Sequence, residues 1–146
     1  MATTLMLVAL LGGALLSSLV PVINAEALVL AGALTASPAL GLTVTLVVTV
    51  GQVAGKVVLY RGGRGIGDSR ATESSERAIR LARHLRSRQG LLHLVFFASA
   101  SVGLPPLYLM AVVAGIARLP LRTFVVLCFA GRFIRFQSLA LIPVLF

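Results

Sequence analysis

Four ionisable residues stand inside long apolar segments of this sequence, where charged side chains are uncommon. Glu26 is the only charged side chain between residues 1 and 55, and Lys56 follows that stretch directly. Arg132 and Arg135 lie in the last apolar segment. A charge at bilayer depth costs roughly 2.5 to 3.5 kcal/mol, so we expect these groups to face protein, water or a substrate.

The chemistry that such groups can perform is capture of an anion, with or without proton exchange. Arginine and lysine bind phosphate through charge and several N–H donors, and burial strengthens the attraction. An alternative is that Glu26 pairs with Lys56 or Arg132 only to lower the cost of burying charge. The candidates for substrate binding or proton coupling are Glu26, Lys56, Arg132, Arg135, Gln52 and Asn24.

The composition indicates that these residues belong to a membrane protein. Of the 146 residues, 58% are hydrophobic and 12% charged, which leaves too few polar side chains to cover a small soluble domain. At about 20 apolar residues per span, there is material for four membrane segments at most. Most of the net charge of +9 falls between residues 61 and 89, where a cytoplasmic loop facing anionic lipids explains it better than nucleic-acid binding.

The first half of the chain begins with a broken apolar segment. Pro21 interrupts residues 15–36 and Ser37-Pro38 ends them, which indicates a re-entrant hairpin or broken helix rather than one straight helix. Leu5 to Leu16 also resembles the core of a signal peptide. Because no basic residue precedes it and the apolar character continues, we expect it to be retained.

Residues 40–60 form the clearest predicted span. Its polar side chains recur at steps of three and four, which places them in one stripe along a helix: Thr45, Thr49, Gln52, Lys56 and Tyr60. Gly51 and Gly55 form a GxxxG pair beside this stripe that would let another helix approach closely. Such pairs also arise by chance in glycine-rich membrane segments.

A basic segment at 61–90 separates the two halves. After the sequence RGGRGIG, which we expect to be flexible, residues 72–88 have helical character, with arginines beside a modest apolar face. We interpret them as an amphipathic helix on the cytoplasmic membrane surface, with a solvated charged loop as the alternative. His84 has no partner at metal-binding spacing and is interpreted as a solvated residue.

The second half also begins with a broken segment. Residues 91–117 are uncharged but contain Pro105 and Pro106, which remove two backbone donors from a segment that hydropathy alone would make a span. If this segment enters and leaves the membrane on one side, Arg118 and Arg122 lie with the basic segment, as the positive-inside bias requires.

The last predicted span has two distinct faces. By helical spacing, one face carries Cys128, Gly131, Arg132, Arg135 and Ser138, and another carries Phe129, Phe133 and Phe136. Because burying two arginines in lipid is costly, we expect the arginines to face inward and the phenylalanines to face lipid. Gly131 is expected to allow close helix packing.

The predicted fold is an all-α integral membrane domain with an inverted-repeat arrangement of two Pro-broken re-entrant hairpins and spanning helices. A basic amphipathic surface helix lies between the halves. The single domain then consists of a first half at 1–60, the basic segment at 61–90 and a second half at 91–146. The repeat rests on VPVINAEALVLAG before Pro38 and LPPLYLMAVVAG before Pro120. Chance similarity between apolar segments is the alternative.

The order of these motifs resembles that of the DedA family, the prokaryotic members of the VTT-domain (SNARE-associated Golgi protein) superfamily. The matching residues are Pro21 and Glu26 before Ala31-Gly32, then GQVAGK, Tyr60 and RGGRG, LPPLY before AGIARLP, and GRFIRF at 131–136. The resemblance implies two opposed re-entrant hairpins that move phospholipids or polyprenyl phosphate between leaflets. It also implies that Glu26 is the intramembrane acid and that Arg132 and Arg135 are basic site positions. Lys56 stands where the family often has an acid.

We therefore expect a multi-pass protein of the inner (cytoplasmic) membrane that acts as a lipid scramblase or flippase. A small proton-coupled ion or drug transporter and a non-transporting membrane scaffold are the alternatives. The sequence contains no Ser/His/Asp set, metal cluster or phosphate loop, so we expect neither an enzyme nor a cofactor. The expected partners are membrane lipids, through an anionic headgroup or polyprenyl phosphate. A homodimer is compatible with this interpretation, and nucleic acid is not expected.

Overall fold

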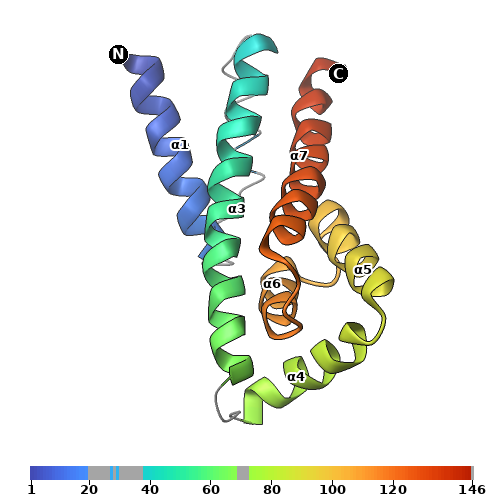
Figure 1. The fold of residues 1–146 in the computed structure, drawn as a ribbon. Helices are drawn as coiled ribbons and strands as arrows, with labels where there is room; N and C mark the ends of the chain where they lie inside the picture. Colours follow the sequence, from blue (N-terminus) through green and yellow to red (C-terminus); the bar gives the residue numbers. More distant parts are fainter. Residues whose placement is uncertain (20–26, 28, 30–37, 69–72, 146) are drawn as a thin grey trace. The chain divides into compact units, whose positions relative to one another are not determined.

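The computed structural model describes residues 1–19, 27, 29, 38–68 and 73–145, which are almost entirely helical and include no strand. The helices are α1 (Ala2–Leu19), α3 (Pro38–Asp68), α4 (Glu73–Arg86), α5 (Gln89–Val102), α6 (Leu107–Ile116) and α7 (Leu121–Leu145) (Figure 1). The all-α prediction is therefore confirmed for the described part of the chain. Pro21, Asn24 and Glu26 lie outside it, as does most of the first predicted hairpin.

The chain divides into two compact units. The first unit comprises Met1–Gly55 and Arg132–Phe146, and the second unit comprises Lys56–Gly131. Both boundaries fall inside helices, since α3 and α7 each supply residues to both units. The predicted single membrane domain, with a first half at 1–60, a basic segment at 61–90 and a second half at 91–146, stays a prediction.

In the first unit, α1 packs closely on α3. A Cβ atom at Gly51 would lie 2.8 Å from Ala14 Cβ, and one at Gly55 would lie 2.5 Å from Ser18 Cβ. The two glycines of the GxxxG pair thus allow the helix backbones to approach each other. A buried apolar cluster completes this unit and contains Ala14, Val29, Val44, Val48 and Phe136.

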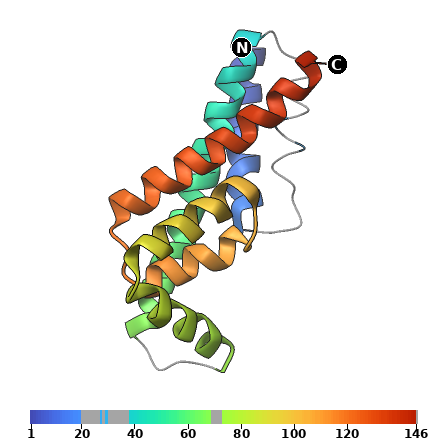
Figure 2. The same ribbon diagram turned by 90° about the vertical axis from the view of Figure 1, so that its right-hand side faces the viewer.

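In the second unit, α5 and α6 pack together as a helical hairpin, and α4 packs against both of them (Figure 2). Pro105 and Pro106 lie in the turn between α5 and α6. Gly103, also in this turn, has a left-handed φ of 92°, a conformation that favours glycine. Gly131 of α7 approaches α5, where a Cβ atom would lie 2.5 Å from Ala100 Cβ.

The prediction that RGGRGIG is flexible is wrong, because α3 continues through these residues to Asp68. α6 packs on this part of α3. A Cβ atom at Gly63 would overlap the backbone of Val112, and one at Gly115 would overlap the Tyr60 carbonyl oxygen. A glycine in a helix is about 1 kcal/mol less stable than an alanine, so these residues have a weak intrinsic preference for helix. Close packing against α6 offsets this cost.

One helix among the described residues is long and apolar enough to cross a membrane, namely the stretch Gly41–Ile66 of α3. The apolar stretches of α1, α5 and α6 are shorter. At 1.5 Å per residue, the 10 residues of α6 extend about 15 Å, half of a hydrocarbon core about 30 Å thick. α6 is therefore too short to cross a bilayer by itself.

Candidate functional site

The best-described site candidate is Lys56, which lies on the buried face of α3 and is 4% exposed. It lies about 4 Å along the helix axis from the middle of the apolar stretch Gly41–Ile66. The other polar residues of the predicted stripe are buried as well: Thr45, Thr49, Gln52 and Tyr60. The opposite face is apolar and exposed, with Leu42, Leu46, Val50 and Val58. α3 thus buries a stripe of polar side chains together with Val44, Val48 and Val53, and along residues 42–58 it exposes apolar side chains.

Several polar groups on the buried face of α3 are used in helix packing. Thr45 and Thr49 donate hydrogen bonds to backbone carbonyls one turn earlier in the same helix. The amide nitrogen of Gln52 donates to the Ala14 carbonyl and to the Ser17 hydroxyl of α1. Because these two bonds use both amide hydrogens, they give Gln52 a structural role within the first unit.

Tyr60 joins α3 to the turn between α6 and α7 in the second unit. Its hydroxyl donates to the Leu119 carbonyl, and its ring centroid lies 4.7 Å from that of Phe124. The ring of Phe96 extends this cluster at 5.0 Å from Phe124, and the Arg64 guanidinium lies 5.9 Å from the Tyr60 ring centroid. The predicted stripe included Tyr60, but no local pattern indicated its partners, because they come from distant parts of the sequence.

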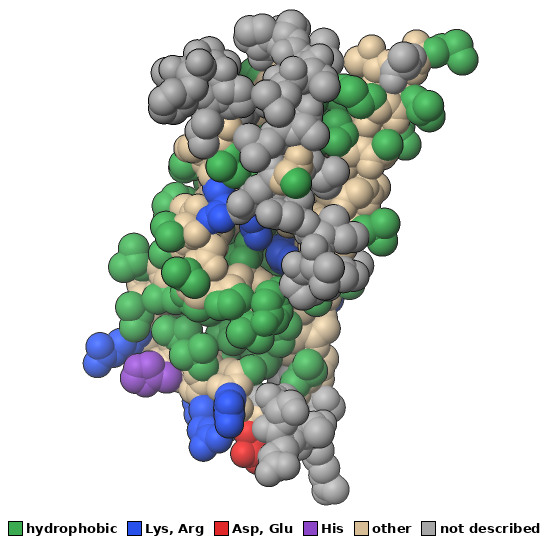
Figure 3. All heavy atoms as spheres, turned by 180° about the vertical axis from the view of Figure 1, so that it is seen from behind, with side chains coloured by type: hydrophobic (Ala, Val, Ile, Leu, Met, Phe, Trp, Pro, Cys, Tyr) green, Lys and Arg blue, Asp and Glu red, His purple; other side chains and the backbone are tan. Residues whose placement is uncertain are grey.

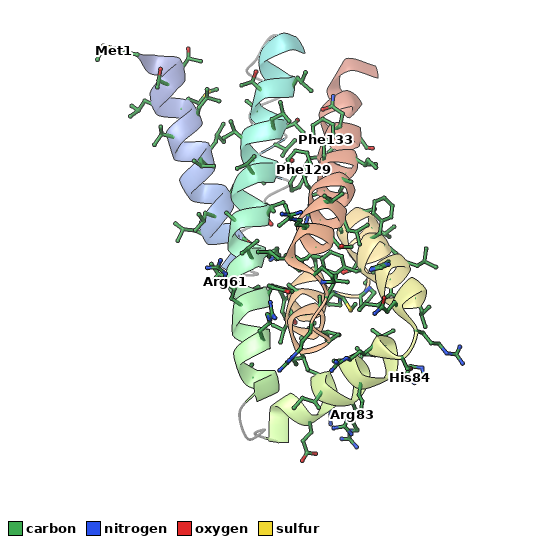
Figure 4. The ribbon with its side chains drawn as sticks, in the orientation of Figure 1. Met1, Arg61, Arg83, His84, Phe129 and Phe133 are labelled. Carbon is green, nitrogen blue, oxygen red and sulfur yellow. The ribbon has the colours of Figure 1, made fainter. Side chains whose placement is uncertain are left out.

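Arg132 and Arg135 are half-buried in α7, within the first unit. The Arg132 guanidinium lies 5.6 Å from the ring centroid of Phe136, which is fully buried. The prediction that the phenylalanines face lipid is wrong for Phe136, because its ring belongs to the apolar cluster of this unit. Phe129 and Phe133 are half-buried and extend from one side of α7 (Figure 4).

The predicted substrate site is divided among different parts of the chain. Lys56 belongs to the second unit, and Gln52, Arg132 and Arg135 belong to the first. Asn24 and Glu26 are not among the described residues. The convergence of these groups on one pocket therefore stays a prediction.

A second group of cations lies on the exposed surface of the second unit. Arg64 is exposed one turn after Tyr60, and Arg118 is exposed beside Leu119, the residue that Tyr60 contacts. Because Tyr60 contacts Leu119, Arg64 near the end of α3 and Arg118 after α6 lie at the same end of this unit. α4 adds further basic residues, which gather with a histidine on the face shown in Figure 3. Arg83 and His84 point away from the helices against which α4 packs (Figure 4).

Neither a metal site nor a known relative identifies the chemistry of these cations. Within the described ranges, no group of three or more His, Cys, Asp or Glu side chains is placed to hold a metal ion. Comparisons of the chain with protein-family models, curated proteins and solved structures give no match. The feature that points to a function is therefore the cations within apolar helices, namely the buried Lys56 and the half-buried Arg132 and Arg135.

Proposed function

We propose that this chain is an integral membrane protein that moves lipids with anionic headgroups, or lipid-linked phosphate carriers, between the leaflets of a bilayer. The observation that carries this proposal is the position of Lys56, a cation 4% exposed in a helix whose exposed face is apolar. Soluble proteins place charged groups outside and apolar groups inside. α3 instead buries Lys56 among other polar side chains and exposes leucines and valines along residues 42–58, an arrangement that suits a helix with lipid outside and polar groups inside.

Exposed apolar side chains on other helices support a bilayer environment. Leu5 and Val8 of α1 are 74% and 63% exposed, and Val126 and Ile134 of α7 are more than half exposed. Contact of such side chains with water costs about 25 cal/mol per Å² of apolar area, whereas hydrocarbon covers them without this cost. A bilayer therefore suits this surface better than water does.

The turn between α5 and α6 supports a re-entrant hairpin. Val102, the last residue of α5, and Leu104 in the turn are apolar and 65% and 73% exposed. Pro105 and Pro106 have no N–H group, and the Pro105 carbonyl accepts a hydrogen bond from the Ser99 hydroxyl. Non-helical backbone is tolerated at membrane depth only where its polar groups are satisfied, and this turn has fewer of them to satisfy.

In the proposed mechanism, Lys56 contacts the anionic headgroup as it crosses the membrane, and Arg132 and Arg135 are the other predicted cationic contacts. Charge-assisted hydrogen bonds from these groups replace the water around the phosphate. Glu26 balances their charge or exchanges a proton. The two opposed hairpins, the DedA-like inverted repeat and a cytoplasmic location of the basic end belong to the same proposal.

The test uses the purified protein in vesicles that contain fluorescent phosphatidylglycerol in both leaflets. Reduction of the outer-leaflet fluorophore by dithionite measures how fast lipid from the inner leaflet becomes accessible. We expect Lys56→Met to slow this movement about tenfold or more, because loss of a charge-assisted hydrogen bond costs about 1.5 to 3 kcal/mol. Arg61→Gln removes an exposed cation from the same helix and should leave the rate unchanged.

Other outcomes distinguish the alternative functions. Unchanged lipid movement with a lower free energy of unfolding in Lys56→Met would make the lysine a structural ion-pair partner. Proton flux without lipid movement in the unmodified protein would favour an ion or drug transporter. Absence of both kinds of transport would contradict the proposal and favour a membrane scaffold.

A further inference from the structure

We propose that the outward face of α4 binds the headgroups of anionic lipids and that α4 does not insert into the bilayer. This inference rests on the membrane location proposed above, but it does not require lipid transport. It identifies a lipid contact on the surface of the second unit, separate from the buried cations.

The apolar side of α4 is mostly occupied by protein, although Leu81 is 45% exposed. Ala82 and Leu85 are 1% and 3% exposed, and α4 packs against α6 and α5. An amphipathic helix that inserts into a membrane buries its apolar face among the acyl chains. Because α4 uses this face to hold the α5–α6 hairpin, only its opposite side remains available to a partner.

The opposite side of α4 is strongly basic. Arg77, Arg80, Arg83 and His84 are exposed there, and Glu76 is the acidic residue among them. The Arg80 guanidinium lies 3.9 Å from the Glu76 carboxylate, with both side chains mostly exposed. An exposed pair of this kind is weak and screened by salt, so the surface keeps a net positive charge.

The surroundings of α4 favour a membrane over a soluble acidic partner. α5 begins three residues after α4 ends, and it exposes Leu91 and Leu94. α6, which packs against α4, exposes Tyr108 and Leu109. A basic helix beside exposed apolar side chains matches the boundary of an anionic bilayer, where headgroups lie next to hydrocarbon.

The experiment places a bimane fluorophore on Ser87→Cys, an exposed position in the turn that directly follows α4, in a Cys128→Ala background. The full-length protein is reconstituted in phosphatidylcholine vesicles with or without phosphatidylglycerol, both containing a lipid with a nitroxide on its headgroup. We expect phosphatidylglycerol to increase quenching and high salt to reverse the increase. Each of Arg77→Gln, Arg80→Gln and Arg83→Gln should weaken headgroup binding about fivefold.

Glu76→Gln is the matched control of opposite sign, because it removes a negative charge from the same face and should strengthen quenching. Circular dichroism verifies that each exposed substitution leaves the fold intact.

Equal quenching with and without phosphatidylglycerol would overturn the inference, and stronger quenching by an acyl-chain nitroxide would show insertion instead. Binding of polyglutamate without any response to phosphatidylglycerol would assign the face to an acidic protein segment. Lys56→Met should leave the quenching unchanged, so failure of the transport proposal is measured separately.

Discussion

At the scale of single residues, the buried polar side chains of α3 have different roles. Gln52 uses both amide hydrogens to hold α1, and Tyr60 donates to the Leu119 carbonyl. These three hydrogen bonds satisfy groups that would be costly to bury alone. Lys56 is the cation of this face, and it is the residue that the proposed function assigns to an anionic substrate.

Tyr60→Phe tests the packing role of the tyrosine hydroxyl. The substitution keeps the ring beside Phe124 but leaves the buried Leu119 carbonyl without this hydrogen bond. We expect the free energy of unfolding, measured by titration from mild detergent into denaturing detergent, to fall by about 1 to 3 kcal/mol. Tyr108→Phe changes an exposed tyrosine and should have little effect. Equal stabilities of the two variants would mean that the Tyr60 hydroxyl does not join α3 to this turn.

At the scale of elements, close helix packing depends on glycines placed at the crossing points. Gly51 and Gly55 admit α1 to α3, Gly63 and Gly115 admit α6 to α3, and Gly131 of α7 admits α5. Small residues allow backbone contact, which is the main source of packing energy between helices in lipid. The same chain also contains glycines in open space, such as Gly62, which provide internal comparisons.

Gly55→Ala and Gly62→Ala should change stability in opposite directions, although both glycines are in α3. A Cβ atom at Gly55 would lie 2.5 Å from Ser18 Cβ and 3.2 Å from the Leu15 carbonyl oxygen, and overpacking of this kind costs about 1 to 3 kcal/mol. Nothing lies within 4 Å of a Cβ atom at Gly62, so alanine there should stabilise the helix by up to about 1 kcal/mol. Denaturing-detergent titration measures both, and an unchanged Gly55→Ala protein would contradict the packing of α1 on α3.

At the scale of the whole molecule, the proposed function requires that the exposed segments of the second unit lie on definite sides of a bilayer. α4 and the arginines near the ends of α3 and α6 lie at one end of the second unit, while the α5–α6 turn is apolar. The proposed re-entrant hairpin, which would enter and leave the bilayer on one side, accounts for both features.

Single cysteines introduced in a Cys128→Ala protein test this arrangement in sealed vesicles. We expect Ser87→Cys and Arg118→Cys to react with a membrane-impermeant maleimide from the same side. Leu104→Cys, in the hairpin turn, should be protected on both sides because hydrocarbon covers it. Denaturation should make all three positions reactive, which verifies that the cysteines are present. Reaction of Ser87→Cys and Arg118→Cys from opposite sides would show that the segment from α5 to α6 crosses the membrane once instead of turning back.

The sequence by itself determined the features that depend on local chemistry. Helical periodicity placed Thr45, Gln52, Lys56 and Tyr60 on one face of α3, and all four are buried. The missing N–H groups of Pro105 and Pro106 located the break between α5 and α6. The helical character of residues 72–88 likewise corresponds to α4.

Only the tertiary structure decided which surfaces these helices present to one another. Glycine-rich residues at the end of α3 remain helical because α6 packs against them, and no local preference for helix would have indicated this. Phe136 is buried because distant residues surround its ring, although helical spacing alone suggested a lipid-facing position. The apolar face of α4 packs on α5 and α6, which leaves its basic face outward. Each of these outcomes depends on contacts between residues far apart in the chain, which periodicity and propensity do not contain.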